Sequence, residues 1–214
     1  MALEYFDVLD CVGRKTGEIV SRDEAHRTGA WHGAFHCLMI YQRGDKNYAL
    51  FQRRSVKKKI APGKFDVSVG GHYASGEDAK AAGPREIKEE LGLDVRFEDL
   101  VPLGRRVFVY CSTPDVLEQE LQDVFFLSRT VEPGKLALQQ EEVDGVLEMD
   151  IDYGIRLFAG SEPFVECSLY RTGIPMERVN VSASEFVPCI DNYYLKLLLL
   201  AQRYLKGERE LLMI

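Results

Sequence analysis

The chain lacks the features that mark nucleic-acid binders and membrane proteins. Its 27 lysines and arginines are outnumbered by 34 aspartates and glutamates, which gives a formal net charge of −7. A nonspecific nucleic-acid binder normally presents a basic face, so this class of partner is not expected. The longest apolar run, residues 197–201, is far shorter than the roughly 20 residues that cross a bilayer. No membrane partner is therefore expected either.

Cysteine is also scarce. The five cysteines are odd in number, are scattered along the chain and form no Cys-x-x-Cys pair. Neither a disulfide framework nor a zinc ribbon is therefore indicated. The N-terminus shows no charged segment followed by an apolar one, the pattern of an export signal. Reduced thiols without an export signal predict a cytoplasmic protein.

The pattern of apolar residues indicates an α/β protein. A length of 214 residues is enough for a domain with its own core. Helical patterns occur at residues 78–91 and 191–207, and helices on both faces of a mixed sheet would fit the order of the elements. The stretches with strand character are residues 4–20 (two short strands), 34–42, 48–54, 65–70, 104–111, 119–128 and, as the last strand, 142–150.

We expect residues 1–150 to form the main domain and residues 151–214 to form a C-terminal extension that packs on it or continues it. Ser182 and Glu185 have the spacing of a capping box, and Gly207 is a suitable stop for the last helix. The leucines and tyrosines of that helix predict either core cover or a dimer face, which leaves a homodimer open. Residues 159–181 are rich in loop residues, and the sequence does not place them.

The most informative stretch is GHYASGEDAKAAGPREIKEELGL, residues 71–93. If residues 78–91 are helical, Glu86, Glu89 and Glu90 stand at i, i+3 and i+4 on one face. Three like charges on one face repel each other, and a hard cation such as Mg²⁺ would remove that repulsion. Pro84 has no N–H for the preceding turn, so it is expected to kink the helix or to shift its start.

This stretch resembles the signature of the Nudix hydrolases at all nine specified positions, from Gly71 through Glu77 to the run that begins at Arg85. The alternative is a solvated acidic helix face. The resemblance implies an α/β/α sandwich and hydrolysis of a nucleoside diphosphate derivative or a related organic diphosphate. It also implies Mg²⁺ or Mn²⁺ held by the three box glutamates and the carbonyl of Gly71, with Arg85 orienting the carboxylates. The predicted residues are Arg85, Glu86, Glu89, Glu90 and Gly71.

Three further stretches, residues 24–40, 52–72 and 117–125, resemble type 1 isopentenyl diphosphate isomerase, which itself has the Nudix fold. That resemblance implies a second divalent-metal site made of histidines and a Glu-x-Glu pair. The alternative is a remnant in which the histidines only form hydrogen bonds. The matching positions are His26, which needs a one-residue gap to align, His32, His72, Glu118 and Glu120.

One position argues against isomerase activity. The isomerases have a catalytic cysteine two residues before the third histidine, where this chain has Gly70. Glycine has no group that moves a proton to or from carbon, and Cys111 is the only cysteine expected on a neighbouring strand. The box glutamates are intact here, whereas the isomerases have no intact hydrolase box. The chain therefore resembles an isomerase-like branch of the Nudix hydrolases.

Basic residues gather around Pro62 and Gly63. Arg54 and Lys58 match the isomerase positions that hold the diphosphate, and arginine and lysine are natural partners of phosphate oxygens. The alternative is an exposed basic loop. The cluster consists of Arg53, Arg54, Lys57, Lys58, Lys59 and Lys64.

Hydrolysis of a small-molecule diphosphate is the function that the sequence favours. The proton of the attacking water would go to a box glutamate or to the Glu118–Glu120 pair, and the sequence leaves this choice open. An isopentenyl diphosphate isomerase-like enzyme is one alternative. A non-catalytic Nudix domain that senses a nucleotide or sugar phosphate is another, although such domains usually lose box glutamates. The identity of the substrate is set by loops and by the C-terminal part.

Overall fold

The computed structural model describes residues 4–113, 116–210 and 212–214. Its strands are β1 (Tyr5–Leu9), β2 (Lys15–Ser21), β3 (His32–Arg43), β4 (Lys46–Arg54), β5 (Phe65–Val67), β6 (Val69–His72), β7 (Leu100–Thr113), β8 (Val116–Ser128), β9 (Val143–Asp150), β10 (Val165–Arg171) and β11 (Ile174–Val181). Its α-helices are α1 (Arg22–Thr28), α2 (Ala79–Leu91), α3 (Ile151–Phe158) and α4 (Tyr193–Leu205). None of the helices within these residues is long and apolar enough to cross a membrane.

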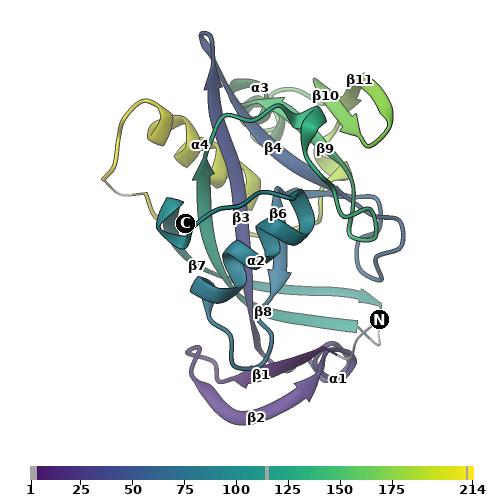
Figure 1. Ribbon diagram of the computed structural model, residues 1–214, viewed down its shortest axis with the longest axis vertical. Helices are drawn as coiled ribbons and strands as arrows, with labels where there is room; N and C mark the ends of the chain where they lie inside the picture. Colours follow the sequence, from purple (N-terminus) through teal and green to yellow (C-terminus); the bar gives the residue numbers. More distant parts are fainter. Residues whose placement is uncertain (1–3, 114–115, 211) are drawn as a thin grey trace.

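The strands form one mixed nine-stranded sheet and a separate pair, β1 and β2 (Figure 1). The main order is β11-β10-β9-β4-β3-β8-β7, with β5 paired to β4 and β6 paired to β3. The predicted hairpin of β7 and β8 is confirmed, although the turn expected at residues 113–115 falls partly outside the described residues. The strand predicted at residues 65–70 is divided into β5 and β6.

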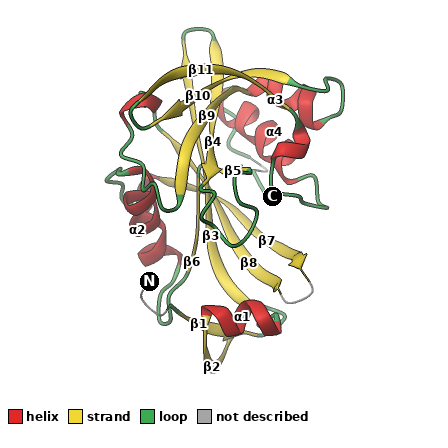
Figure 2. Cartoon of the chain, turned by 90° about the vertical axis from the view of Figure 1, so that its right-hand side faces the viewer, coloured by secondary structure: helices red, strands yellow, loops and turns green. Residues whose placement is uncertain are grey.

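Strand β3 is the centre of the molecule because its side chains are buried on both faces. Leu38 and Ile40 pack with α3 and α4 in one core cluster. Phe35 and Met39 pack with α2 in the other. Helix α2 therefore covers one face of the sheet and α3 and α4 cover the opposite face (Figure 2). This arrangement confirms the predicted α/β sandwich with a mixed sheet.

Helix α2 is the predicted acidic helix. The carboxylate of its N-cap, Asp78, accepts a hydrogen bond from the backbone N of Ala81 at 3.0 Å, which satisfies one free N–H of the first turn. Pro84 lies inside the helix, which nevertheless runs from Ala79 to Leu91, so the predicted shift of the helix start is wrong. The acidic residues of the box therefore keep their helical spacing.

The C-terminal residues continue the main sheet. The prediction that residues 142–150, now β9, form the last strand is wrong. Strand β10 pairs with β9, and β11 pairs with β10. The predicted capping box is confirmed, since the carboxylate of Glu185 accepts a hydrogen bond from the backbone N of Ser182 at 2.7 Å. In α4, Leu197 and Leu198 are fully buried in the core of the chain. The apolar face of α4 therefore covers the sheet.

Candidate active site

A cavity of about 160 Å³ opens where β3, β6, β8 and α2 meet, and the segment before α4 forms part of its wall. Its lining combines acidic residues with a smaller number of basic ones. The predicted box residues line this cavity, and so do His72, Glu118 and Glu120 of the predicted second site, whereas His26 and His32 do not. The two predicted sites are therefore neighbours. The glutamates that line it are Glu4, Glu86, Glu89, Glu90, Glu118, Glu120 and Glu142.

The box glutamates are not equally exposed. Glu90 is only 3% exposed and Glu86 is 8% exposed, whereas the side chain of Glu89 is 49% exposed. Burial disfavours the charged form, and it raises the pKa of Glu86 to about 7 and that of Glu90 to about 8. Glu90 accepts long hydrogen bonds from Nε2 of Gln52 at 3.2 Å and from the backbone N of Gly70 at 3.3 Å. Two buried carboxylates with so few donors form a suitable site for a divalent cation.

Gly71 leaves the room that Glu86 occupies. A Cβ atom at position 71 would lie less than 3.0 Å from the carboxyl group of Glu86, a separation that real side chains do not show. Glycine therefore allows the backbone and the carboxylate to approach each other closely, and any larger residue would displace one of them. The backbone of β6 and the carboxylate of Glu86 together form the cradle in which the sequence resemblance places a metal ion.

Arg85 forms hydrogen bonds with three glutamates of the box. Its Nε and Nη2 atoms donate to Glu77 at 2.9 and 2.7 Å, and its Nη1 atom donates to Glu86 at 2.9 Å and to Glu89 at 3.0 Å. Nη2 also donates to the carbonyl of His72 at 3.3 Å. One guanidinium thus fixes three carboxylates and the end of β6, and few of its N–H groups remain for a substrate.

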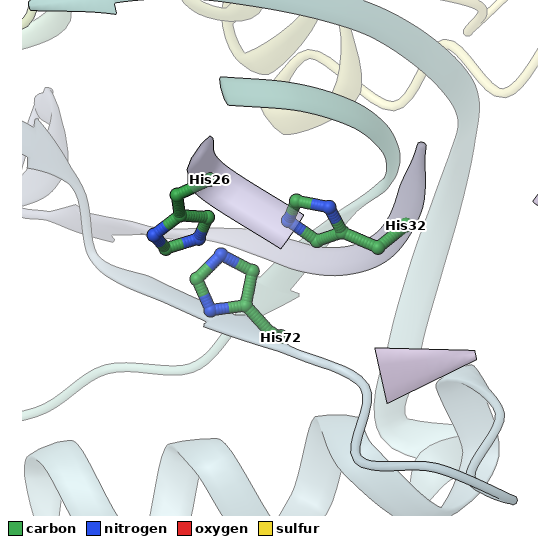
Figure 3. A group of neighbouring side chains, drawn as sticks. All are labelled: His26, His32 and His72. Atoms are coloured by element: carbon green, nitrogen blue, oxygen red, sulfur yellow. The ribbon is translucent and has the colours of Figure 1, made fainter. Parts of the chain in front are cut away.

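The predicted second set of ligands forms a cluster of two groups that share His72, and Figure 3 shows the three histidines of the first group. His26 comes from α1, His32 begins β3, His72 ends β6, and Glu118 and Glu120 lie on β8. In the first group, one ring nitrogen from each of the three histidines lies within 4.8 Å of the other two. In the second group, one nitrogen of His72 and one carboxylate oxygen each of Glu118 and Glu120 lie within the same distance of one another. Nε2 of His72 lies 3.1 Å from Oε1 of Glu120, and Nε2 of His32 lies 4.0 Å from the same oxygen.

Several ligand atoms of this cluster lack hydrogen bonds. The Nε2 atoms of His26 and His32 and Oε1 of Glu118 are buried without a hydrogen-bond partner among the described residues. His26 and Glu118 do approach to 3.1 Å, but not in hydrogen-bonding geometry. Buried polar atoms without partners are costly, so their convergence fits an additional ligand such as a metal ion. Imidazole with carboxylate suits Mn²⁺, Zn²⁺ or Fe²⁺.

The charges of the cluster respond to burial. Burial lowers the pKa of His26 to about 4 and that of His72 to about 3, so both rings are neutral near pH 7 and have a free nitrogen for a metal. Burial raises the pKa of Glu118 to about 9. The pKa of Glu120 is lowered in spite of burial, because His72 forms a hydrogen bond with its carboxylate. Neutral imidazoles beside an ionised glutamate are the protonation states that metal binding requires.

The predicted diphosphate-binding residues line the cavity but are already paired. Arg54 donates to the carbonyl of Ile60 at 3.2 and 3.0 Å and lies 3.4 Å from Asp66. Lys58 forms an ion pair with Glu142. The remaining members of the basic cluster do not contribute to the lining of this cavity and form contacts with Asp144, Glu141, Asp23 and the carbonyl of Ser184.

Sequence reasoning missed a chain of hydrogen bonds that reaches the cluster from the C-terminal part. Asp191 accepts from Arg106 at 2.8 and 2.9 Å, and Arg106 donates to Oε1 of Gln122 at 2.8 Å. Nε2 of Gln122 then donates to Glu120 at 2.6 Å. Gln122 follows Glu120 by two residues on β8, so strand periodicity could have indicated it. Arg106 and Asp191 carried no such signal.

The C-terminal part also supplies residues of the cavity wall. Val187, Pro188 and Tyr194 line it, and so does Cys189. Cys111 lies on β7 as a neighbouring strand of β8, but it is exposed and does not line the cavity. It is not the only cysteine on a neighbouring strand, as had been expected, because Cys37 on β3 lies opposite Val69 of β6. The segment before α4 folds back over the sheet and brings Cys189 to the cavity instead.

The chain matches known proteins over the region that contains the box residues of this cavity. The NUDIX domain model matches residues 30–153. An uncharacterized Nudix hydrolase of Clostridium acetobutylicum is 35% identical over 156 residues, which are 71% of this chain and 72% of that one. A solved structure from Deinococcus radiodurans has a similar fold, with a TM-score of 0.55 and 24% identity, and covers 74% of this chain and 91% of its own. An isopentenyl-diphosphate Delta-isomerase of Mycolicibacterium vanbaalenii is 34% identical over 92 residues, 43% of this chain and 49% of that one.

Proposed function

The chain belongs to the Nudix hydrolases, enzymes that act on diphosphate-containing compounds, and we propose that its substrate is a nucleoside diphosphate derivative or a related organic diphosphate. The pair of buried carboxylates, Glu86 and Glu90, beside Gly71 carries this proposal. Two acidic groups removed from water are unfavourable alone and become favourable with a divalent cation.

We propose that Glu86, Glu89, Glu90 and the carbonyl of Gly71 hold Mg²⁺ or Mn²⁺. Such an ion, when bound, neutralises the diphosphate and lowers the pKa of a water that attacks phosphorus. Arg85 keeps the carboxylates in position through the hydrogen bonds described above. This role differs from binding substrate, since the guanidinium is occupied by its own glutamates.

Arg54 and Lys58, which also line the cavity, are proposed to contact the diphosphate. Their present partners, Asp66 and Glu142, hold the two cations at the cavity. The proton of the water goes to a carboxylate at the cavity, either one of the box glutamates or Glu120, which stays ionised beside His72.

A hydrolysis screen tests this proposal. The purified protein is incubated with nucleoside diphosphate derivatives and other organic diphosphates in Mg²⁺ and in Mn²⁺, and the phosphate products are identified. We expect cleavage within the diphosphate that stops on addition of a chelator. If no diphosphate is cleaved and a nucleotide or sugar phosphate binds, the chain is a sensing domain instead.

A second metal site is proposed from His26, His32, His72, Glu118 and Glu120, because their unpaired ligand atoms converge. Elemental analysis of protein purified without chelator is expected to show a transition metal. The His32→Ala, His72→Ala double variant should lose that metal. His36→Gln is the matched control, since the fourth histidine lies outside the cluster, and it should retain the metal. An unmodified protein that binds no transition metal, even after incubation with Mn²⁺ or Zn²⁺, contradicts the site.

Isomerisation of isopentenyl diphosphate to dimethylallyl diphosphate is not expected. Gly70 has no side chain to move a proton, and burial raises the pKa of Cys189, the cysteine that lines the cavity. The assay follows formation of dimethylallyl diphosphate over a protein-free background. Product formed well above background, and abolished by Cys189→Ala, would show that this thiol replaces the missing one.

We also propose that the protein works in the cytoplasm without a nucleic-acid or membrane partner. The net charge of −7 supports the first of these absences. A homodimer would need a face other than the buried side of α4, because Leu197 and Leu198 are used within the chain. Sedimentation velocity of the purified protein decides between monomer and dimer.

A further inference from the structure

His36 is the one histidine outside the metal-ligand cluster, and it also lines the cavity. It lies on β3 opposite Gly70 of β6 and is almost fully buried. Its Nδ1 atom lies 3.2 Å from the hydroxyl of Tyr193, the first residue of α4. Its Nε2 atom forms no hydrogen bond with any of the described residues. One ring nitrogen is thus held by the protein while the other remains available.

The hydroxyl of Tyr193 decides which nitrogen of His36 carries the proton. Tyr193 is buried, and burial raises the pKa of its hydroxyl, so it remains protonated. Within the described part of the chain, its one hydrogen-bond partner is Nδ1 of His36. A buried O–H without an acceptor is unfavourable, so the hydroxyl donates and Nδ1 accepts. Burial also lowers the pKa of His36, which keeps the ring neutral with its proton on Nε2.

Gly70 leaves free space in front of this Nε2–H group. A Cβ atom at position 70 would lie 3.4 Å from Nε2 of His36 and 3.6 Å from its Cδ2. The backbone N of the same glycine donates to Glu90 of the box. The residue that leaves this space therefore also contacts the box through its backbone, and His36 and Glu90 line the same cavity.

We propose that His36 and Gly70 form a binding subsite for a phosphoryl oxygen of the substrate, in which Nε2–H of His36 donates a hydrogen bond to that oxygen. This inference rests on the proposed diphosphate hydrolysis. Nε2–H only donates, and the non-bridging oxygens of a diphosphate only accept. The neighbouring cations, Arg54 and Lys58, are paired with carboxylates, so a donor without such a partner complements them. Tyr193 acts as the positioning residue, because it fixes the tautomer.

Kinetics of three variants test the subsite. His36→Ala removes the donor and should lower kcat/KM by about 10- to 100-fold, the range expected for one hydrogen bond to a charged group. His36→Gln places an amide N–H near the position of Nε2 and should recover part of this loss. Gly70→Ala leaves the ring intact and fills the space in front of it with a methyl group, so it should lower kcat/KM to a similar extent.

Gly134→Ala is the matched control for Gly70→Ala. A Cβ atom at position 134 meets Tyr170 at the same 3.4 Å distance, but away from the cavity, and kcat/KM should not change. Binding of methylenediphosphonate with Mg²⁺, measured by calorimetry, should weaken about 10-fold or more in His36→Ala and in Gly70→Ala. ¹⁵N NMR of the free protein should show the proton of His36 on Nε2.

The outcomes separate the two proposals. If the unmodified protein cleaves no diphosphate, the proposed function fails. If it cleaves its substrate and Gly70→Ala does so at the same rate, the subsite is wrong, whether or not His36→Ala folds. A proton on Nδ1 would likewise contradict the donor role. A loss in His36→Ala that His36→Gln does not relieve, together with normal binding of methylenediphosphonate, would assign His36 a structural role only.

Discussion

Replacing Glu90 with glutamine is expected to lower kcat by at least about 10²-fold while the protein remains folded. The change keeps the size of the side chain, and its amide oxygen still accepts from Gln52 and from the backbone N of Gly70. It removes the buried negative charge that is proposed to hold the metal ion. Loss of such a ligand removes several kcal/mol of transition-state stabilisation, on the order of 10²-fold or more in rate. Steady-state kinetics at saturating Mg²⁺ measure the effect, and Glu89→Gln should change kcat in the same direction.

Glu98→Gln provides the control for this experiment. Glu98 is an exposed glutamate that follows the box, and its carboxylate lies 3.8 Å from Lys80, outside the cavity. Its replacement should leave kcat unchanged. Turnover by Glu90→Gln at the rate of the unmodified protein would show that the box is not the catalytic centre.

Gly71→Ala is expected to reduce kcat/KM by about 10²-fold or more, although the change adds only one methyl group. The new Cβ would overlap the carboxyl group of Glu86, and either that side chain or β6 has to move. A displacement of about 1 Å at a catalytic group costs roughly 10²-fold in rate. Titration with Mg²⁺ should also show weaker activation than in the unmodified protein, because Glu86 and the carbonyl of Gly71 lose their relative positions.

Two other glycines serve as comparisons for Gly71→Ala. Gly134→Ala makes only an ordinary van der Waals contact and should behave like the unmodified protein. Gly70→Ala keeps Glu86 in place, so its activation by Mg²⁺ should remain normal even if its kcat/KM falls. Normal activity of Gly71→Ala would mean that Glu86 can move without consequence, and the cradle described here would have no role in catalysis.

The acidic helix could be predicted from sequence because its geometry is local. Helical spacing alone places Glu86, Glu89 and Glu90 on one face. The N-cap Asp78 accepts a hydrogen bond from the backbone N–H of Ala81, only three residues further along the chain. Pro84 did not shift the start of this helix. The strands β3, β4, β8 and β9 were found for a similar reason, since runs of apolar residues bounded by turns are local signals.

The histidine cluster required both the resemblance to the isomerases and the register of the sheet. The parallel register of β3 and β8 places His32 opposite Glu120, and the pairing of β3 with β6 places Ala34 opposite His72. No spacing along the chain predicts which residues of two distant strands face each other. Sequence similarity identified these residues, and the register explains why they meet.

The C-terminal contribution to the cavity was decided by tertiary structure alone. Residues 159–181 show weak strand character, because β11 is an exposed edge strand with little apolar alternation to mark it. Tyr193 of α4 reaches His36 across 157 positions, and Asp191 reaches Arg106 across 85. Such contacts depend on where the last helix packs on the sheet. The sequence by itself therefore determined the acidic helix and its chemistry. The packing of the C-terminal residues on the sheet decided which of them line the cavity beside that helix.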